Sequence, residues 1–131
     1  MKRTVLITRG LVSLLGLALI VLGVLFWTGH ALALLPVHML LGALFVVCLW
    51  VLSGIALSAR AGAAFTLTVF VWSLVVLALG MAQVTLLPSP RHWIVQAAHL
   101  LVGLIAIGLG HALAARILRL TGGARRVISR V

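Results

Sequence analysis

Residues 33–59 read ALLPVHMLLGALFVVCLWVLSGIALSA. This stretch contains no Asp, Glu, Lys or Arg, and most of its side chains are aliphatic or aromatic. At 1.5 Å per residue, a helix of about 20 apolar residues crosses the hydrocarbon core of a bilayer. The only proline, Pro36, falls in the first turn of the predicted helix, where a missing N–H is tolerated. The stretch therefore predicts a transmembrane helix.

Three further stretches have the same apolar character, and they cover approximately residues 5–28, 63–87 and 90–120. We expect Thr28-Gly29-His30 to end the first, and Ser89 and Pro90 to supply the N-cap and the first helical position of the last. Thr121-Gly122-Gly123 should end that helix and begin a basic tail, 121–131.

Short connections make sequential helices antiparallel neighbours. The predicted fold class is therefore all-α, an integral membrane antiparallel four-helix bundle that forms one transmembrane domain, 1–131.

The composition excludes several classes of protein. Of the 131 residues, 65% are hydrophobic and 8% are charged, and no Asp or Glu occurs. Carboxylates are therefore missing for general acid–base catalysis, for Mg²⁺ or Ca²⁺ binding and for a carboxylate proton relay. The formal net charge of +10 lies beside apolar segments, so we expect contact with the lipid bilayer and its anionic lipids, and not with nucleic acid.

The basic residues predict the orientation. Nine of the ten fall on one side of the four spans, and only Arg91 falls on the other. The nine are Lys2, Arg3, Arg9, Arg60, Arg116, Arg119, Arg125, Arg126 and Arg130. By the positive-inside rule this predicts a bacterial inner (cytoplasmic) membrane protein with both termini cytoplasmic. The basic tail would anchor this topology by binding anionic lipid, or it would dock onto an acidic partner subunit. Assembly into a larger membrane complex or a homo-oligomer is also compatible with the sequence.

Two histidines open the same short pattern on alternate predicted helices. His38 is followed by Gly42 and His99 by Gly103, and a glycine four residues after a histidine lies on the same helix face. Both helices run inward from the outer side, which places both rings roughly 10 Å below the outer interface. A loose similarity between 13–19 and 73–79 suggests two duplicated helical hairpins that place these histidines face to face.

With these motifs, helices 33–59 and 90–120 resemble those of the small four-helix membrane b-type cytochromes. The resemblance implies a haem b held by His38 and His99 near the periplasmic face, with the two glycines making room for it. It also implies electron transfer between membrane quinol and a partner. A second haem would need a histidine pair near the inner side, where only His111 lies.

Other interpretations stay open at this point. His38 and His99 could hydrogen-bond between helices, or form a different metal site or a quinone site. Gln83 could bind a haem propionate, a quinone carbonyl or a neighbouring helix. His30 and His92 fit solvated interfacial positions, although with Met39 and Met81 they could bind copper.

Three functions follow from these interpretations. The first is a b-type cytochrome that carries electrons without catalysing a group transfer. The second is a cofactor-free accessory or assembly subunit of a larger membrane complex. The third, a small transporter or channel, is disfavoured because no acid or lysine lies within a span.

Overall fold

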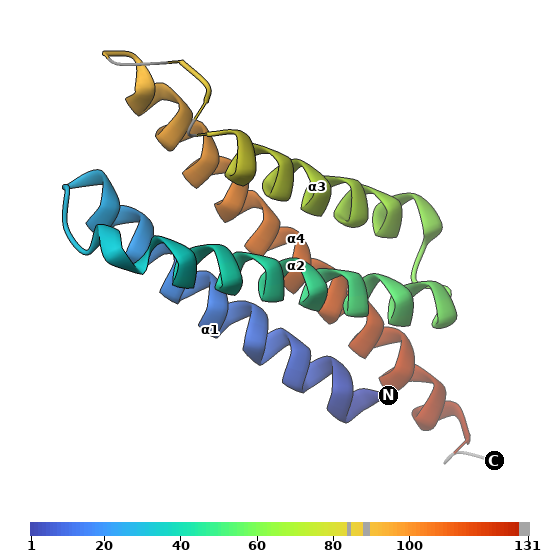
Figure 1. The fold of residues 1–131 in the computed structure, drawn as a ribbon. Helices are drawn as coiled ribbons and strands as arrows, with labels where there is room; N and C mark the ends of the chain where they lie inside the picture. Colours follow the sequence, from blue (N-terminus) through green and yellow to red (C-terminus); the bar gives the residue numbers. More distant parts are fainter. Residues whose placement is uncertain (84, 88–89, 129–131) are drawn as a thin grey trace.

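The computed structural model describes residues 1–83, 85–87 and 90–128, and only the backbone of 123–128. Throughout these residues the regular structure is helical, as predicted, and no strand occurs among them. The elements in chain order are α1 (Lys2–Trp27), the short 3₁₀ helix η1 (Leu32–Leu34), α2 (Leu35–Ser58), α3 (Ala63–Ala82) and α4 (His92–Ile128) (Figure 1).

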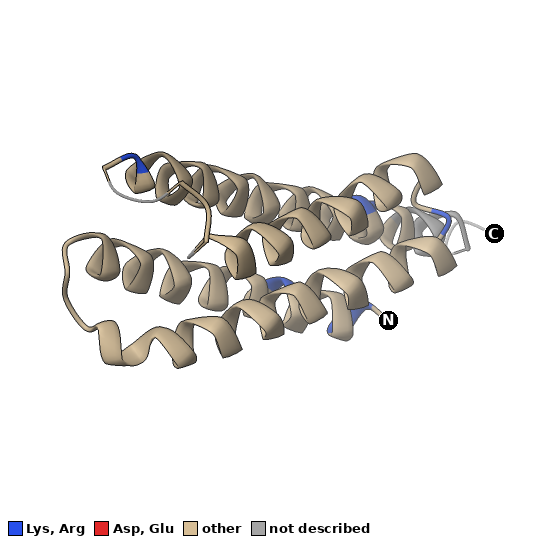
Figure 2. Ribbon diagram, turned by 45° about the horizontal axis from the view of Figure 1, so that its top comes forward, with Lys and Arg blue, Asp and Glu red and all other residues tan. Residues whose placement is uncertain are grey.

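Each helix packs against its neighbours in the chain, and α1 also packs against α4. The chain turns back after each helix, so that its two ends lie at the same end of the molecule (Figure 1). Lys and Arg gather toward this end, and one basic segment stands alone at the opposite end (Figure 2). Arg91 directly precedes α4, the helix that runs from that end of the molecule to the end with the termini.

Within the described residues, four helices are long and apolar enough to cross a membrane. The side chains on their outer surfaces are largely apolar; Leu14 is 65% exposed and Leu101 is 60% exposed. A soluble protein would place such residues inside. The prediction of four long apolar helices is therefore confirmed.

The connection between α3 and α4 differs from the prediction. Helix α3 ends at Ala82, where a helix to residue 87 was expected. The carbonyl of Ala82 accepts the backbone N–H groups of Thr85 and Leu86 and also the Thr85 hydroxyl, which closes a turn. Leu87 has a φ of +43°, which is not helical. It also directly precedes Pro88 in the sequence, and a proline disfavours the helical conformation at the residue before it.

The bounds of α4 differ at both ends. It begins at His92 and not at Pro90, and the predicted N-cap, Ser89, lies outside the described residues. At the other end α4 continues through Gly122 and Gly123 to Ile128, so 121–128 is helical, where a tail after the helix was expected. Glycine weakens a helix by about 1 kcal/mol relative to alanine but does not break it, and no proline follows.

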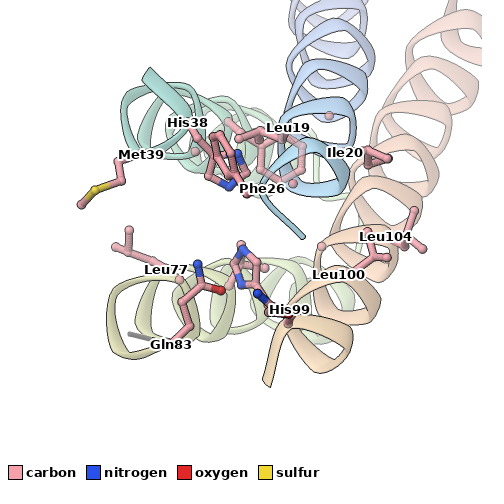
Figure 3. Close-up of a pocket in the computed structure, with 18 of the residues that line it drawn as sticks. Leu19, Ile20, Phe26, His38, Met39, Leu77, Gln83, His99, Leu100 and Leu104 are labelled. Carbon is pink, nitrogen blue, oxygen red and sulfur yellow. The ribbon is translucent and has the colours of Figure 1, made fainter. Parts of the chain in front are cut away.

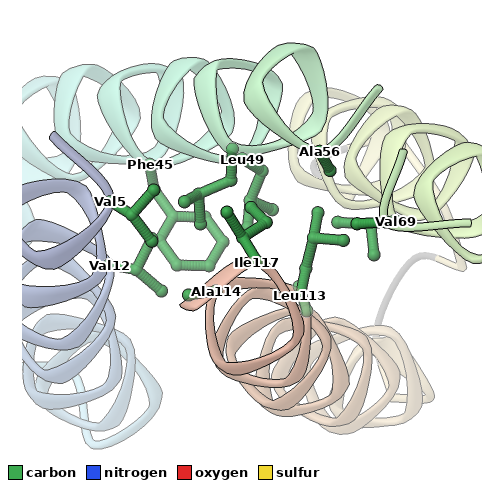
Figure 4. Close-up of a cluster of buried hydrophobic side chains, with 12 residues drawn as sticks. Val5, Val12, Phe45, Leu49, Ala56, Val69, Leu113, Ala114 and Ile117 are labelled. Atoms are coloured by element: carbon green, nitrogen blue, oxygen red, sulfur yellow. The ribbon is translucent and has the colours of Figure 1, made fainter. Parts of the chain in front are cut away.

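The end of the bundle near the termini is tightly packed. Fully buried side chains from α1, α2 and α4 meet there and form what we call the packed half: Val5, Val12, Leu49, Leu52, Leu113 and Ile117. Most of these side chains converge on one point between the helices (Figure 4). Gly110 lets the helices approach closely, since a Cβ there would lie 2.7 Å from Cδ2 of Leu49.

Candidate functional site

His38 on α2 and His99 on α4 meet at the end of the bundle opposite the termini, as the matched depths predicted (Figure 3). Their ring centres lie 6.4 Å apart, and their planes make an angle of 54°. A metal at about 2 Å from one nitrogen of each imidazole would separate the ring centres by about 6 Å. The two rings therefore already have the spacing of a pair of ligands to one metal ion.

Neither ring has a hydrogen-bond partner among the described residues. The Nδ1 atom of each histidine is buried and unpartnered. A buried polar atom left without a partner costs about 1–3 kcal/mol, so such atoms are uncommon and call for an explanation. The interhelical hydrogen bond considered as an alternative is not formed, which leaves both rings available to a ligand.

A glycine on the preceding helix seats each imidazole. A Cβ at Gly80 of α3 would lie 3.1 Å from Cε1 of His99, and a Cβ at Gly23 of α1 would lie 4.0 Å from Cε1 of His38. Each odd-numbered helix thus places a glycine beside a histidine of the next helix, closely at Gly80 and at ordinary van der Waals distance at Gly23. Sequence reasoning missed both glycines, because nothing in the sequence links them to a histidine on another helix.

A cavity of about 410 Å³ lies around the two rings, within the size range of small-molecule and cofactor sites. All four helices contribute to its wall, which is almost entirely apolar and includes Leu19, Phe26, Leu77, Leu100, Leu104 and Ile107. Phe26 also packs edge-on against His38, with ring centres 5.4 Å apart. We call this region the cavity half. Its apolar wall would exclude water from a ligand held between the histidines.

The other predicted site residues also line this cavity. Gly42 and Gly103 are in its wall, and a Cβ at Gly103 would meet nothing within 4 Å. Gln83, which caps the C-terminal end of α3, and Gln96 on α4 supply amide groups. The Gln83 side chain lies on the same side of the cavity as His99 (Figure 3).

The remaining histidines lie outside the cavity wall and have local partners. His30 shares a hydrogen bond of 3.1 Å with the Thr28 hydroxyl, and the Nδ1–H of His92 donates to the carbonyl of Leu86 at 3.3 Å. His111 on α4 bonds to Arg9 and Ser13 of α1. Met39 lines the cavity, but its sulfur points away from both rings (Figure 3).

The site therefore offers a metal two imidazoles. Among the described residues, no three His, Cys, Asp or Glu side chains are grouped closely enough to hold a bare metal ion. Zinc and copper usually take three or four ligands from the protein, whereas haem brings four nitrogens of its own. Two facing histidines in an apolar cavity suit a metal that arrives with its other ligands.

Helix α4 is fixed beside the site by a tryptophan. The indole N–H of Trp72 on α3 donates to the carbonyl of Val102 at 3.0 Å, next to Gly103. This bond ties α3 to α4 just below the level of His99. It helps to hold the ring at a fixed position over the cavity.

No protein-family model, curated protein or solved structure matches the chain. A functional assignment accordingly rests on His38, His99 and the apolar cavity between them.

Proposed function

We propose that the protein is an integral membrane b-type cytochrome that holds haem b between His38 and His99 and passes electrons within the membrane. The single observation that carries this proposal is the pair of unpartnered imidazoles, 6.4 Å apart, across an apolar cavity. Haem b would supply an iron that takes up and releases one electron. The chain would hold that iron, exclude water from it and fix its depth.

The surroundings of the rings favour a flat, apolar ligand. Gly42 and Gly103 keep side chains out of the space beside the histidines, and the open space in front of Gly103 is wide enough for more than a methyl group. Gln83 and Gln96 provide amide N–H groups that could bind a propionate of the haem or a carbonyl oxygen of a quinone. A quinol is an apt electron donor for this site because it shares the membrane with it.

The proposal includes the placement in the membrane. Four apolar helices would form an antiparallel bundle of two related hairpins in a bacterial inner membrane, with both termini cytoplasmic. The distribution of basic residues supports this orientation, since one basic segment stands alone at the end opposite the termini (Figure 2), and Arg91 directly precedes α4. The haem would then lie near the periplasmic face.

Visible spectroscopy tests the proposal. The full chain, purified in mild detergent from haem-replete cells, should show a Soret band and a sharp α-band on reduction with dithionite. His38→Ala and His99→Ala should each lose the sharp α-band, because one remaining imidazole would not keep the iron low-spin. His111→Ala, which removes a histidine bonded elsewhere, should keep the full spectrum.

Two outcomes would contradict the proposal. A colourless protein that is well folded by circular dichroism would favour a cofactor-free accessory or assembly subunit. Equal loss of the α-band in His38→Ala, His99→Ala and His111→Ala would show that the bands do not come from this pair.

A further inference from the structure

A second polar cluster lies on α1 and α4, away from the histidine cavity. The Nε–H of Arg9 donates to Nδ1 of His111 at 3.1 Å. The other ring nitrogen, Nε2, lies 3.1 Å from the Ser13 hydroxyl, which itself donates to the carbonyl of Arg9 at 3.2 Å. We call these three residues the Arg9 cluster.

The directions of these hydrogen bonds are mutually consistent. Arginine has only donors, so Nδ1 of His111 must accept and Nε2 must carry the proton. That proton can be donated to Ser13, whose own hydrogen is used on the backbone. The cluster therefore fits a neutral imidazole that orients the guanidinium by accepting its Nε–H.

The two terminal NH₂ groups of that guanidinium are left for another partner. Arginine has five N–H donors, and among the described residues only the Nε–H of Arg9 is engaged. The chain has no Asp or Glu side chain that could pair with it. Arg9 and Ser13 are also exposed on the outer surface of the bundle, where lipid would lie. The charge of Arg9 thus calls for an anion from outside the chain.

The position of Arg9 suits an anion at the membrane surface. Arg9 lies seven residues into the span, about 10 Å along the axis from Lys2. Side chains on a helix lean toward its N-terminus, which for α1 is the proposed cytoplasmic side. A long arginine there can extend back to the level of the headgroups. Guanidinium binds phosphate oxygens through two parallel hydrogen bonds, which a fixed orientation favours.

We propose that the Arg9 cluster binds the phosphate of an anionic phospholipid from the cytoplasmic leaflet. Arg9 makes the contact, and His111 and Ser13 are positioning residues that act through it. This inference rests on the membrane placement proposed above and is independent of haem. It differs from general attraction of the basic tail to lipid because it assigns one oriented site between α1 and α4.

Native mass spectrometry can test this site on the full chain in neutral detergent, with phosphatidylglycerol or phosphatidylcholine added. The wild type should retain one phosphatidylglycerol more tightly than phosphatidylcholine. Arg9→Gln should weaken that first binding event about fivefold, the contribution expected of one basic residue near anionic lipid. Arg9→Lys should bind phosphatidylglycerol with an affinity between those of the wild type and Arg9→Gln. Lysine keeps the charge, but its single ammonium cannot bond His111 and also donate two parallel hydrogen bonds to a phosphate.

Arg119→Gln is the matched control, since it removes an exposed arginine from α4 at the same end of the bundle. It should change the first binding event less than twofold. His111→Ala should weaken phosphatidylglycerol without changing phosphatidylcholine, whereas a purely structural bond between α1 and α4 would affect both lipids equally.

Three results would overturn the inference. They are equal losses in Arg9→Gln and Arg119→Gln, equal binding of the two lipids by the wild type, and displacement of the lipid by millimolar inorganic phosphate. Retention of neither lipid would count against the membrane placement as well. The absorbance spectrum of each sample reports haem separately, so failure of the cytochrome proposal would be distinguishable.

Discussion

The packed half and the cavity half are built by the same helices but are filled in opposite ways. Leu49 and Leu113 are fully buried at the packed end of α2 and α4, whereas His38 and His99 face a cavity at the other end of these helices. Two glycines of α4, seven residues apart and so on one face, show the contrast. A Cβ at Gly110 would lie 2.7 Å from Leu49, and a Cβ at Gly103 would meet nothing within 4 Å.

This difference does not come from a shortage of apolar side chains, because each of the four helices contains an apolar segment long enough to cross a membrane. It comes from where glycine and histidine are placed. Inside a membrane, helices associate through close packing and hydrogen bonds more than through the hydrophobic effect. A half that lacks such packing would gain stability from any ligand that fills its cavity.

The largest effect should come from filling the two glycine positions. Gly110→Leu should destabilise the bundle by about 3 kcal/mol or more, because the new side chain would overlap Leu49 and Val12. Gly103→Leu should change stability by less than about 1 kcal/mol and yet prevent haem binding, since it occupies the cavity. Reversible unfolding in mixed micelles, followed by circular dichroism, measures the first effect, and the Soret absorbance measures the second.

Equal destabilisation by the two leucines would remove the distinction between the halves. Haem binding retained in Gly103→Leu would show that the cavity beside this glycine is not where the ligand lies.

A smaller effect is expected from removing one leucine from each half. Leu113→Ala should cost about 2 kcal/mol, because the fully buried side chain leaves a gap in close-packed surroundings. Leu100→Ala, in the wall of the cavity, should cost less than about 1 kcal/mol in the haem-free protein, since space already exists beside it. The same unfolding assay compares them, and a larger loss for Leu100→Ala would contradict the comparison.

The smallest effect concerns the contact between Gly80 and the imidazole of His99. Gly80→Ala should leave stability nearly unchanged but move the His99 ring by a few tenths of an ångström, because its Cβ would lie 3.1 Å from Cε1. We expect about tenfold weaker haem binding, a factor that corresponds to about 1.4 kcal/mol. Haem titration measures it. Gly54→Ala is the control, with nothing within 4 Å of its Cβ, and an equal effect there would exclude a role for this contact.

The sequence predicted most of the architecture because it depends on one-dimensional patterns. The length of the apolar stretches predicted the four helices. The similar depth of His38 and His99 on two alternate helices predicted that the two rings lie close together. The turn after Ala82 was missed because it depends on three hydrogen bonds to one carbonyl, and not on hydropathy.

The glycine seats were missed for a different reason. Gly23 and Gly80 matter only through contacts with another helix, and helix rotation cannot be read from an apolar pattern that is nearly uniform around each helix. His111 shows the same limit. Nothing in the sequence identifies Arg9, on another helix, as its partner.

The packing of α1 against α4 has a consequence for the order of assembly. Arg9 and Ser13 find their partner, His111, only on the last helix, and His38 finds His99 on that same helix. In the proposed membrane placement, the first three helices would be made before these partners exist, because the chain is synthesised from its N-terminus. Closure of the bundle, completion of the Arg9 cluster and completion of the histidine pair would then coincide in one late step, the docking of α4.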